Sequence, residues 1–212
     1  MLYLDILNKK QIKVLEKLDF LDDQVYLAGG TALALQMGHR TSLDFDFYSK
    51  VDFKQDILIS EFQKRFNNMT VENIARGTLI LTIDEINFSL FHYPYELISK
   101  FVVLKHTKMA SIEDASAMKF LAVAMRGKRR DFIDVYYLLK QFKLNELLGF
   151  VKKKYPTFEE LMILKGLIFF EDAEDEDISR GIKIFDKDFS WELAKKTITE
   201  EVTKYQLSMI DH

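Results

Sequence analysis

The spacing of apolar residues changes about halfway along the 212-residue chain. Up to about residue 110, short apolar runs of strand length alternate with helical stretches, whereas from Ser111 onward the spacing is almost entirely helical. We therefore expect an α+β (mixed α/β) fold. Residues 1–110 would form a sheet with flanking helices, and residues 111–212 would form a helical lobe.

Composition limits the kinds of site that the chain can hold. The absence of cysteine excludes disulfide scaffolds, thiolate zinc sites and cysteine nucleophiles, so oxygen or imidazole must hold any metal. Charged residues interrupt the apolar positions near the N-terminus, which fits neither a signal peptide nor a membrane span. We expect a cytoplasmic protein with no membrane partner.

The net charge of −3 gives no overall attraction to nucleic acid, so a polyanion would need a local basic cluster. Two runs are candidates, residues 126–130 and 152–154. The alternative for each run is a solvated helix face.

A strand, a glycine turn and a short helix precede the most informative motif. Residues 25–28 read as a strand that ends at Gly29 and Gly30, and a helix then runs from Thr31 until Gly38 ends it. The other expected elements are helices at 8–20, 54–66, 111–125, 131–141, 144–153, 157–169 and 191–206, and a hairpin of strands 78–83 and 86–91 that turns at Asp84 and Glu85.

Residues 43–48 alternate apolar and polar side chains with period two, which places Asp44 and Asp46 on one face of a strand. Two carboxylates roughly 6 to 7 Å apart at the backbone can converge on one cation. Without a cation they would repel each other, so the pair favours a hard divalent metal such as Mg²⁺. Metal-assisted phosphoryl or nucleotidyl transfer is the chemistry that this pair predicts.

A triphosphate also needs a group of donors, and the turn before the helix provides them. Glycine allows backbone N–H groups to approach phosphate oxygens, and the helix N-terminus adds partial positive charge. Thr31 adds a hydroxyl. Neither this turn nor the aspartate pair is specific by itself, because plain connections and surface strands have the same patterns; the prediction rests on their combination.

Two stretches of the sequence resemble a known family. The first contains Gly-Gly-Thr-Ala-Leu-Ala-Leu, His-Arg-Thr-Ser and Asp-Phe-Asp-Phe, within residues 29–47. The second joins Glu-Asp-Ala-Ser-Ala-Met-Lys at 113–119 to the run at 129–139 that begins Arg-Arg-Asp-Phe-Ile-Asp. These stretches resemble the AbiEii/AbiGii family, the nucleotidyltransferase toxins of bacterial abortive-infection and type IV toxin–antitoxin systems, and the resemblance covers about residues 27–139. It implies a polymerase-β-like nucleotidyltransferase sheet.

In the first lobe, the resemblance implies that Asp44 and Asp46 bind Mg²⁺. The nucleotide-binding candidates are Gly29, Gly30, Thr31, Arg40 and Ser42. The alternative for Arg40 is an ion pair with one of the aspartates, and the alternative for Ser42 is a cap of the loop.

In the helical lobe, the resemblance implies that Lys119 contacts the nucleotide phosphates and that Asp131 is a catalytic or positioning residue. Asp134 lies on the same helix face as Asp131, at i+3, and with Arg130 it is a candidate for a supporting role. The alternative for the two aspartates is salt bridges to the basic residues at 128–130.

One expected feature of polymerase-β-like enzymes is missing. They place a third carboxylate on a neighbouring strand, but strand 86–91 offers Asn87 and Ser89 at those positions, and neither is a useful base at neutral pH. Three explanations remain: Asp131 or Asp134 takes the role, the metal alone activates the acceptor, or activity has been lost. We rank them in that order.

Three functions follow from these residues and the resemblance. The first is a toxin that transfers a nucleoside monophosphate from an NTP to a hydroxyl of RNA, with the acceptor stem of tRNA as a target, or of a protein, and that a cognate antitoxin restrains. The second is a catalytically impaired nucleotide sensor or interaction module. The third is a protein phosphotransferase.

Overall fold

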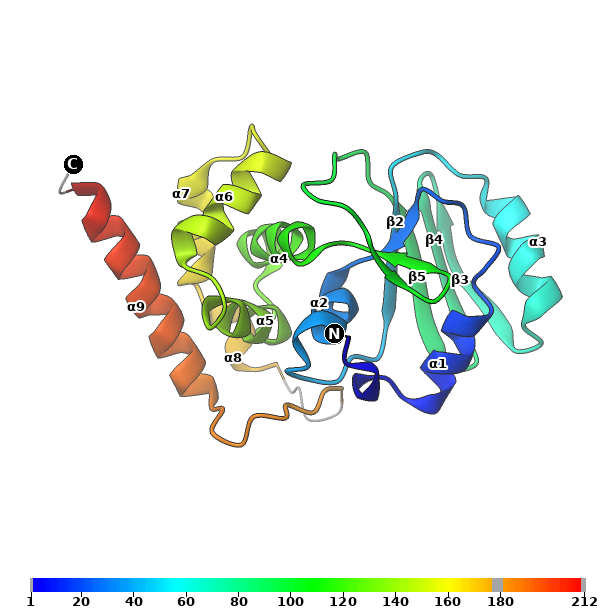
Figure 1. Ribbon diagram of the computed structural model, residues 1–212, viewed down its shortest axis with the longest axis horizontal. Helices are drawn as coiled ribbons and strands as arrows, with labels where there is room; N and C mark the ends of the chain where they lie inside the picture. Colours follow the sequence, from blue (N-terminus) through cyan, green and yellow to red (C-terminus); the bar gives the residue numbers. More distant parts are fainter. Residues whose placement is uncertain (1, 177–180, 211–212) are drawn as a thin grey trace. The chain divides into compact units, whose positions relative to one another are not determined.

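The computed structural model describes residues 2–176 and 181–210, and the chain divides into two compact units, Met1–Ser111 and Ile112–His212 (Figure 1). The first unit contains the sheet and the second contains helices. The fold is therefore α+β, as the change in apolar spacing predicts.

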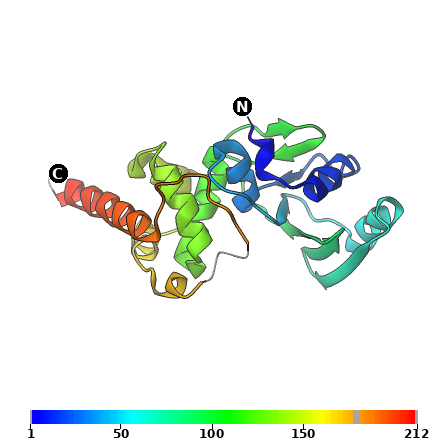
Figure 2. The same cartoon turned by 90° about the horizontal axis from the view of Figure 1, so that it is seen from below.

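The first unit is built on a seven-stranded sheet with the strand order β3-β4-β5-β2-β1-β7-β6. Strand β2 pairs parallel with β5, β1 pairs parallel with β7, and the remaining pairs are antiparallel. The hairpin of β6 and β7 and the strand β3 lie at opposite edges of the sheet (Figure 2). The strands are β1 Val25–Leu27, β2 Phe45–Ser49, β3 Met69–Ala75, β4 Thr78–Ile83, β5 Ile86–His92, β6 Val102–Leu104 and β7 Thr107–Met109.

Alternation along the central strands makes the core of the first unit. Phe45 and Phe47 of β2 and Phe88 of β5 are fully buried, and Phe88 meets Phe62 edge to face at 4.9 Å between ring centroids. The polar residues between them, including Asp46, are only partly buried. The sheet thus has an apolar face turned to the core and a second face that carries the aspartates. The helices of this unit are η1 Leu4–Ile6, α1 Lys9–Glu16, α2 Gly29–Met37 and α3 Gln55–Arg65.

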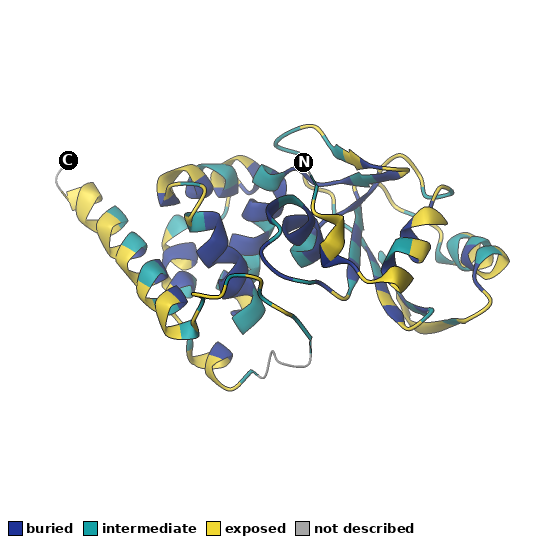
Figure 3. Ribbon diagram, turned by 60° about the horizontal axis from the view of Figure 1, so that its bottom comes forward, coloured by how far each residue is buried: buried dark blue, intermediate teal, exposed yellow. Residues whose placement is uncertain are grey.

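The second unit is a set of packed helices around α4. Helix α4 packs against α5, α6 and α7, and a Cβ at Gly166 of α7 would lie 2.6 Å from the Ala124 Cα, so this helix contact needs a glycine. Helix α9 buries Ala194, Ile198 and Val202, and its other residues are partly or fully exposed (Figure 3). The helices are α4 Ile112–Arg126, α5 Arg129–Leu139, α6 Leu144–Lys154, α7 Glu160–Leu167, α8 Glu171–Glu174 and α9 Trp191–Ile210.

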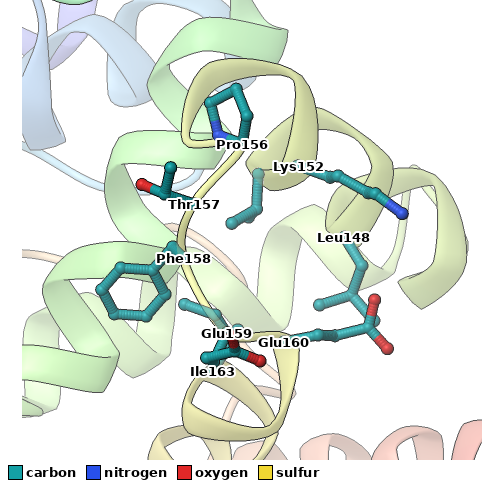
Figure 4. A pocket seen from close by; sticks show the side chains of 9 residues that line it. Leu148, Lys152, Pro156, Thr157, Phe158, Glu159, Glu160 and Ile163 are labelled. Carbon is teal, nitrogen blue, oxygen red and sulfur yellow. The ribbon is translucent and has the colours of Figure 1, made fainter.

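A hollow of about 270 Å³ lies between α6 and the start of α7 (Figure 4). Leu148, Val151 and Ile163 supply apolar walls, while Lys152 and Glu160 are among its charged residues. The residues that line this hollow include none of the site residues predicted from the sequence. In the described parts of the chain, no helix is both long and apolar enough to cross a membrane.

Most expected elements are present, with shifted ends. The helix predicted for 8–20 ends at Glu16, that for 157–169 spans Glu160–Leu167, and that for 131–141 begins at Arg129. The hairpin at 78–91 is confirmed, and Asp84 and Glu85 turn it with φ of 49° and 69°, the left-handed values that a type I′ turn requires. Strands β3, β6 and β7 were not expected.

Candidate active site

The start of α2 lies directly beside Asp46. Gly29 has a φ of 62°, and a Cβ there would stand 2.9 Å from Asp46 Oδ2. The backbone N–H of Ala28 donates to the carbonyl of Asp46 at 2.9 Å, which ties the turn to β2. Because Gly29 has no side chain, the helix N-terminus can approach this carboxylate closely.

The first turn of α2 suits an anion for a second reason. No side chain caps the N-terminus of this nine-residue helix. The first N–H groups of a helix have no partner within the helix, and the helix dipole adds partial positive charge to them. The turn at Gly29 and Gly30 therefore places backbone donors of the kind that suits an anion beside the carboxylate of Asp46.

Asp44 and Asp46 lie on the same side of β2. Asp44 immediately precedes the strand and Asp46 is its second residue, while Phe45 between them is fully buried. Both aspartates are partly exposed. The structure thus brings together the two carboxylates and the glycine turn, as the sequence predicts.

The strand beside the aspartates carries an amide and a hydroxyl. Parallel pairing of β2 with β5 puts Ser89 opposite Asp46. Asn87 lies two residues before Ser89, on the same face of β5. Asn87 Nδ2 donates to Asp44 Oδ1 at 2.9 Å. The residue at the position of the expected third carboxylate therefore contacts the first aspartate directly.

Thr31 and Ser42 support the backbone of the aspartate loop. The Thr31 hydroxyl is buried and donates to the carbonyl oxygen of Asp44. Because a hydroxyl has one hydrogen to donate, the 2.7 Å contact between Ser42 Oγ and Thr31 Oγ1 has Ser42 as its donor. These two hydroxyls hold the α2 N-terminus against the loop before β2.

Two further buried side chains shape this loop. Arg40 is 2% exposed, and its Nη1 donates to the carbonyl of Thr41 at 2.9 Å. Gln11 of α1 is fully buried, and its Nε2 donates to the carbonyl of Ser42 at 2.8 Å. Sequence reasoning missed Gln11. The Asn8-x-x-Gln11 capping box was a signal for the start of α1, but not for a contact 31 residues away.

In the second unit, Lys119 of α4 lies between two aspartates of α5. Its Nζ is 2.6 Å from Asp131 Oδ1 and 2.9 Å from Asp134 Oδ2. Arg126 adds a contact of 3.3 Å to the other oxygen of Asp131. The Lys119 residue is 5% exposed, and Asp131 and Asp134 are 1% and 0% exposed. The structure thus collects three of the four predicted residues of this unit, Lys119, Asp131 and Asp134, into one buried charge cluster.

The environment of Asp131 determines its protonation state. Burial opposes its ionisation, but the charges of Lys119 and Arg126, with the hydrogen bond from Lys119, outweigh burial and hold the pKa of Asp131 below its ordinary value. A carboxylate with a lowered pKa is a weaker proton acceptor. The cluster is therefore better suited to positioning Lys119 than to acting as a base.

Several basic side chains of the runs at 126–130 and 152–154 are engaged with other parts of the protein and do not form open surface patches. Lys154 is fully buried, with its Nζ 2.7 Å from the equally buried Asp114, so it cannot belong to a surface patch. In the other run, Arg129 is directed to α8 and the residues after it, donating from Nε to the carbonyl of Ala173 and from its backbone N–H to Glu176. Arg130 is half-buried on α5 beside Asp131.

The donor set of the first unit fits Mg²⁺. Within the described residues, no group of three or more His, Asp or Glu side chains could hold a metal. Magnesium is commonly held by one or two carboxylates and completes its shell with waters and substrate phosphates. Asp44 and Asp46, with the Gly29–Gly30 turn beside them, match that requirement.

Comparison with known proteins shows the family of this chain. The sequence pattern of the family described as nucleotidyl transferase AbiEii toxin, type IV toxin–antitoxin system, matches residues 13–87 and 70–195. An uncharacterised protein of Aquifex aeolicus (strain VF5), aq_aa25, is 34% identical over 208 residues, covering 94% of this chain and 97% of its own length.

Two solved structures share the fold. One is an H. pylori protein described as a candidate nucleotidyltransferase, with a TM-score of 0.58 and 16% identity over 96% of each chain. The other is MenT4, a nucleotidyltransferase toxin of Mycobacterium tuberculosis H37Rv, with a TM-score of 0.54 and 14% identity over 91% of this chain and 83% of its own. The sheet is thus that of polymerase-β-like nucleotidyltransferases, and the chain belongs to the AbiEii family of nucleotidyltransferase toxins of type IV toxin–antitoxin systems.

Proposed function

We propose that this chain transfers a nucleoside monophosphate from an NTP to a hydroxyl group of an RNA or a protein, and that tRNA is the RNA to test first. The observation that carries the proposal is the contact between the α2 N-terminus and the aspartate strand. A Cβ at Gly29 would stand 2.9 Å from Asp46 Oδ2, so the proposed phosphate donors lie beside one of the proposed metal ligands.

Asp44 and Asp46 would hold Mg²⁺, and the N–H groups at Gly29 and Gly30 would bind the phosphates. When bound, Mg²⁺ neutralises negative charge on the triphosphate and on the leaving pyrophosphate. Thr31, Ser42 and Arg40 support the site from beneath. Thr31 donates to the backbone of Asp44, Arg40 donates to the backbone of Thr41, and the hydroxyls of Thr31 and Ser42 contact each other.

Lys119 would supply positive charge to the nucleotide phosphates, with Asp131 and Asp134 fixing its ammonium group. A lysine held by two carboxylates has little rotational freedom, so its charge is pre-positioned. Arg130 and Asp134 would support this arrangement.

The acceptor hydroxyl must lose a proton as its oxygen attacks the α-phosphorus and pyrophosphate leaves with the bonding electrons. Asn87 and Ser89 cannot accept that proton at neutral pH. Asp131 is a poor acceptor because its pKa is lowered. We therefore propose that the acceptor hydroxyl loses its proton directly to water.

As a toxin, the protein would act in the cytoplasm, where NTPs and tRNA are found, and a cognate antitoxin would restrain it. Membership of a type IV toxin–antitoxin family supports both the toxic effect and the antitoxin partner.

The test is label transfer by the purified protein, with Mg²⁺ and total tRNA or total protein as acceptor. Label from the α-phosphate of an NTP should enter the acceptor, and label from the γ-phosphate should not. The γ-label arm detects a protein phosphotransferase. Asp44→Ala should abolish transfer, whereas Asp56→Ala, an exposed aspartate of α3, should not. Transfer that survives Asp44→Ala unchanged would contradict the assignment of the metal site.

A nucleotide sensor is the second candidate, because Asn87 stands where a third carboxylate was expected and contacts Asp44. Calorimetry with each NTP and Mg²⁺ separates the two functions. Binding without transfer to any acceptor favours the sensor, and transfer favours the enzyme. Absence of binding defeats both.

A further inference from the structure

Asn87 contacts Asp44 directly, yet the proposed transfer reaction gives it no role. It lies on β5, the strand parallel to β2, and its exposed side chain donates from Nδ2 to Asp44 Oδ1 at 2.9 Å. The direction of this bond is fixed by chemistry, because an ionised carboxylate only accepts hydrogen bonds and the amide must present its nitrogen to it.

The amide changes the charge of the site. With Asn87 in place of a carboxylate, the aspartate face carries two negative charges from Asp44 and Asp46, which one divalent cation neutralises. Each further carboxylate near a divalent ion would strengthen metal binding, because the Coulomb energy between the charges is large at contact distance. The unliganded site therefore has less attraction for cations than a three-carboxylate site would have.

We propose that Asn87 is a positioning residue that holds Asp44 in its metal-binding orientation while keeping the empty site weak for divalent cations. Tight metal binding then needs the phosphates of a nucleotide, which supply the missing negative charge. This inference rests on the proposed function, since it assumes that Asp44 binds the metal.

The two parts of the proposal predict opposite effects for two substitutions. Asn87→Asp adds a carboxylate beside Asp44, and the affinity of the nucleotide-free protein for Mn²⁺ should rise on the order of tenfold or more. Asn87→Ala removes the hydrogen bond without changing the charge, and Mn²⁺ affinity in the presence of a non-hydrolysable NTP analogue should fall about threefold to tenfold. A purely structural role for Asn87 would make both variants lose affinity.

The experiment is titration of the full chain with Mn²⁺, followed by the electron paramagnetic resonance signal of free Mn²⁺, with and without the analogue. Asn73→Asp is the matched control, because it makes the same chemical change on the exposed edge strand β3, about 14 Å from β2 by strand spacing. It should leave Mn²⁺ affinity unchanged. Thermal unfolding checks that the variants are folded.

The outcomes separate this inference from the proposed function. Equal Mn²⁺ affinities for Asn87→Asp, Asn73→Asp and the unmodified protein would overturn the inference, even where Asp44-dependent label transfer upholds the function. Tight Mn²⁺ binding by the unmodified protein without nucleotide would also overturn it. Mn²⁺ binding that Asp44→Asn leaves unchanged would overturn both.

Discussion

The candidate residues of the first unit and Lys119 of the second differ in what fixes their positions. Asp44, Asp46 and the glycine turn occur where the motif spacing places them, because strand alternation and a left-handed glycine are local properties. The contacts of Thr31 and Ser42 with the backbone of the aspartate loop were not readable, since they depend on tertiary packing. The same holds for Lys119, whose two partners come from the next helix.

The charge cluster at Lys119 should make stability depend on pH. The pKa of Asp131 is lowered in the folded state, so its contribution to stability is present above the ordinary aspartate pKa of about 3.9 and is lost as the pH falls through the folded value. Asp131→Asn should be less stable than the unmodified protein at pH 7, and the difference should narrow below about pH 4. Urea unfolding at pH 7, 5, 4 and 3 measures this.

The control for that profile is Asp56→Asn, in which an exposed aspartate of α3 changes in the same way. The free energy of unfolding of this variant should differ little from that of the unmodified protein at every pH. A constant difference for Asp131→Asn across the same range would show that the lowered pKa of Asp131 contributes nothing to folding.

The second buried ion pair, between Asp114 and Lys154, should be a strong single determinant of stability in the helical unit. Both side chains are fully buried, with 2.7 Å between Oδ1 and Nζ. Asp114→Ala leaves the lysine charge buried without its partner and should cost about 3 to 5 kcal/mol of unfolding free energy. The double variant Asp114→Leu with Lys154→Met should recover most of that loss, because both charges of this pair are then removed.

Fluorescence of Trp191 is a suitable signal for this experiment, because the chain has one tryptophan and it packs in the second unit against Phe132 and Phe170. A loss below about 1 kcal/mol for Asp114→Ala would show that water or another group takes over the role of the aspartate.

At the level of elements, the sequence predicted those helices and strands that have a strong apolar period or clear turn residues. It missed strands in which the period is weak or too short. The hairpin at 78–91 and the helix ended by Gly38 follow from turn chemistry that the sequence contains. Strand β3 was missed because most of its residues are exposed, so its burial does not alternate, as expected for an edge strand. Strands β6 and β7 have three residues each, which is too short for a period of two to be recognised.

The junction between β1 and α2 can be tested by replacing its glycine, Gly29, with alanine. Gly149, an unhindered glycine within α6, is the control. Gly29→Ala forces a Cβ into a left-handed position and against Asp46 Oδ2, so it should cost about 1 to 2 kcal/mol and lower nucleotide transfer at least about tenfold. Gly149→Ala in α6 meets nothing within 4 Å, and it should stabilise the protein by about 0.5 to 1 kcal/mol.

Thermal unfolding and the label-transfer assay together check this pair. Transfer by Gly149→Ala should equal that of the unmodified protein. If Gly29→Ala were as active and as stable as the unmodified protein, the close approach of α2 to Asp46 would be unnecessary for nucleotide transfer.

For the molecule as a whole, charge limits the way in which RNA can bind. The net charge of −3 gives no general attraction, and several basic side chains are already directed to acidic partners within the described residues. These pairs are Arg126 with Asp131, Lys140 with Asp186, Lys154 with Asp114 and Lys195 with Glu174. An RNA acceptor would therefore be held by few phosphate contacts, with recognition concentrated near its reacting end.

This limit predicts a shallow salt dependence. With about two or three phosphate contacts, the KM for an RNA acceptor should rise only about sevenfold to fortyfold between 50 and 200 mM KCl, because each contact adds roughly 0.7 to 0.9 to the slope of log affinity against log salt. Proteins with six to ten contacts lose about a thousandfold or more over that range. The KM for the NTP, measured in the same buffers, separates weakened RNA binding from weakened nucleotide binding. A thousandfold rise for RNA alone would show that an extended basic surface binds the acceptor, contrary to the ion pairs described above.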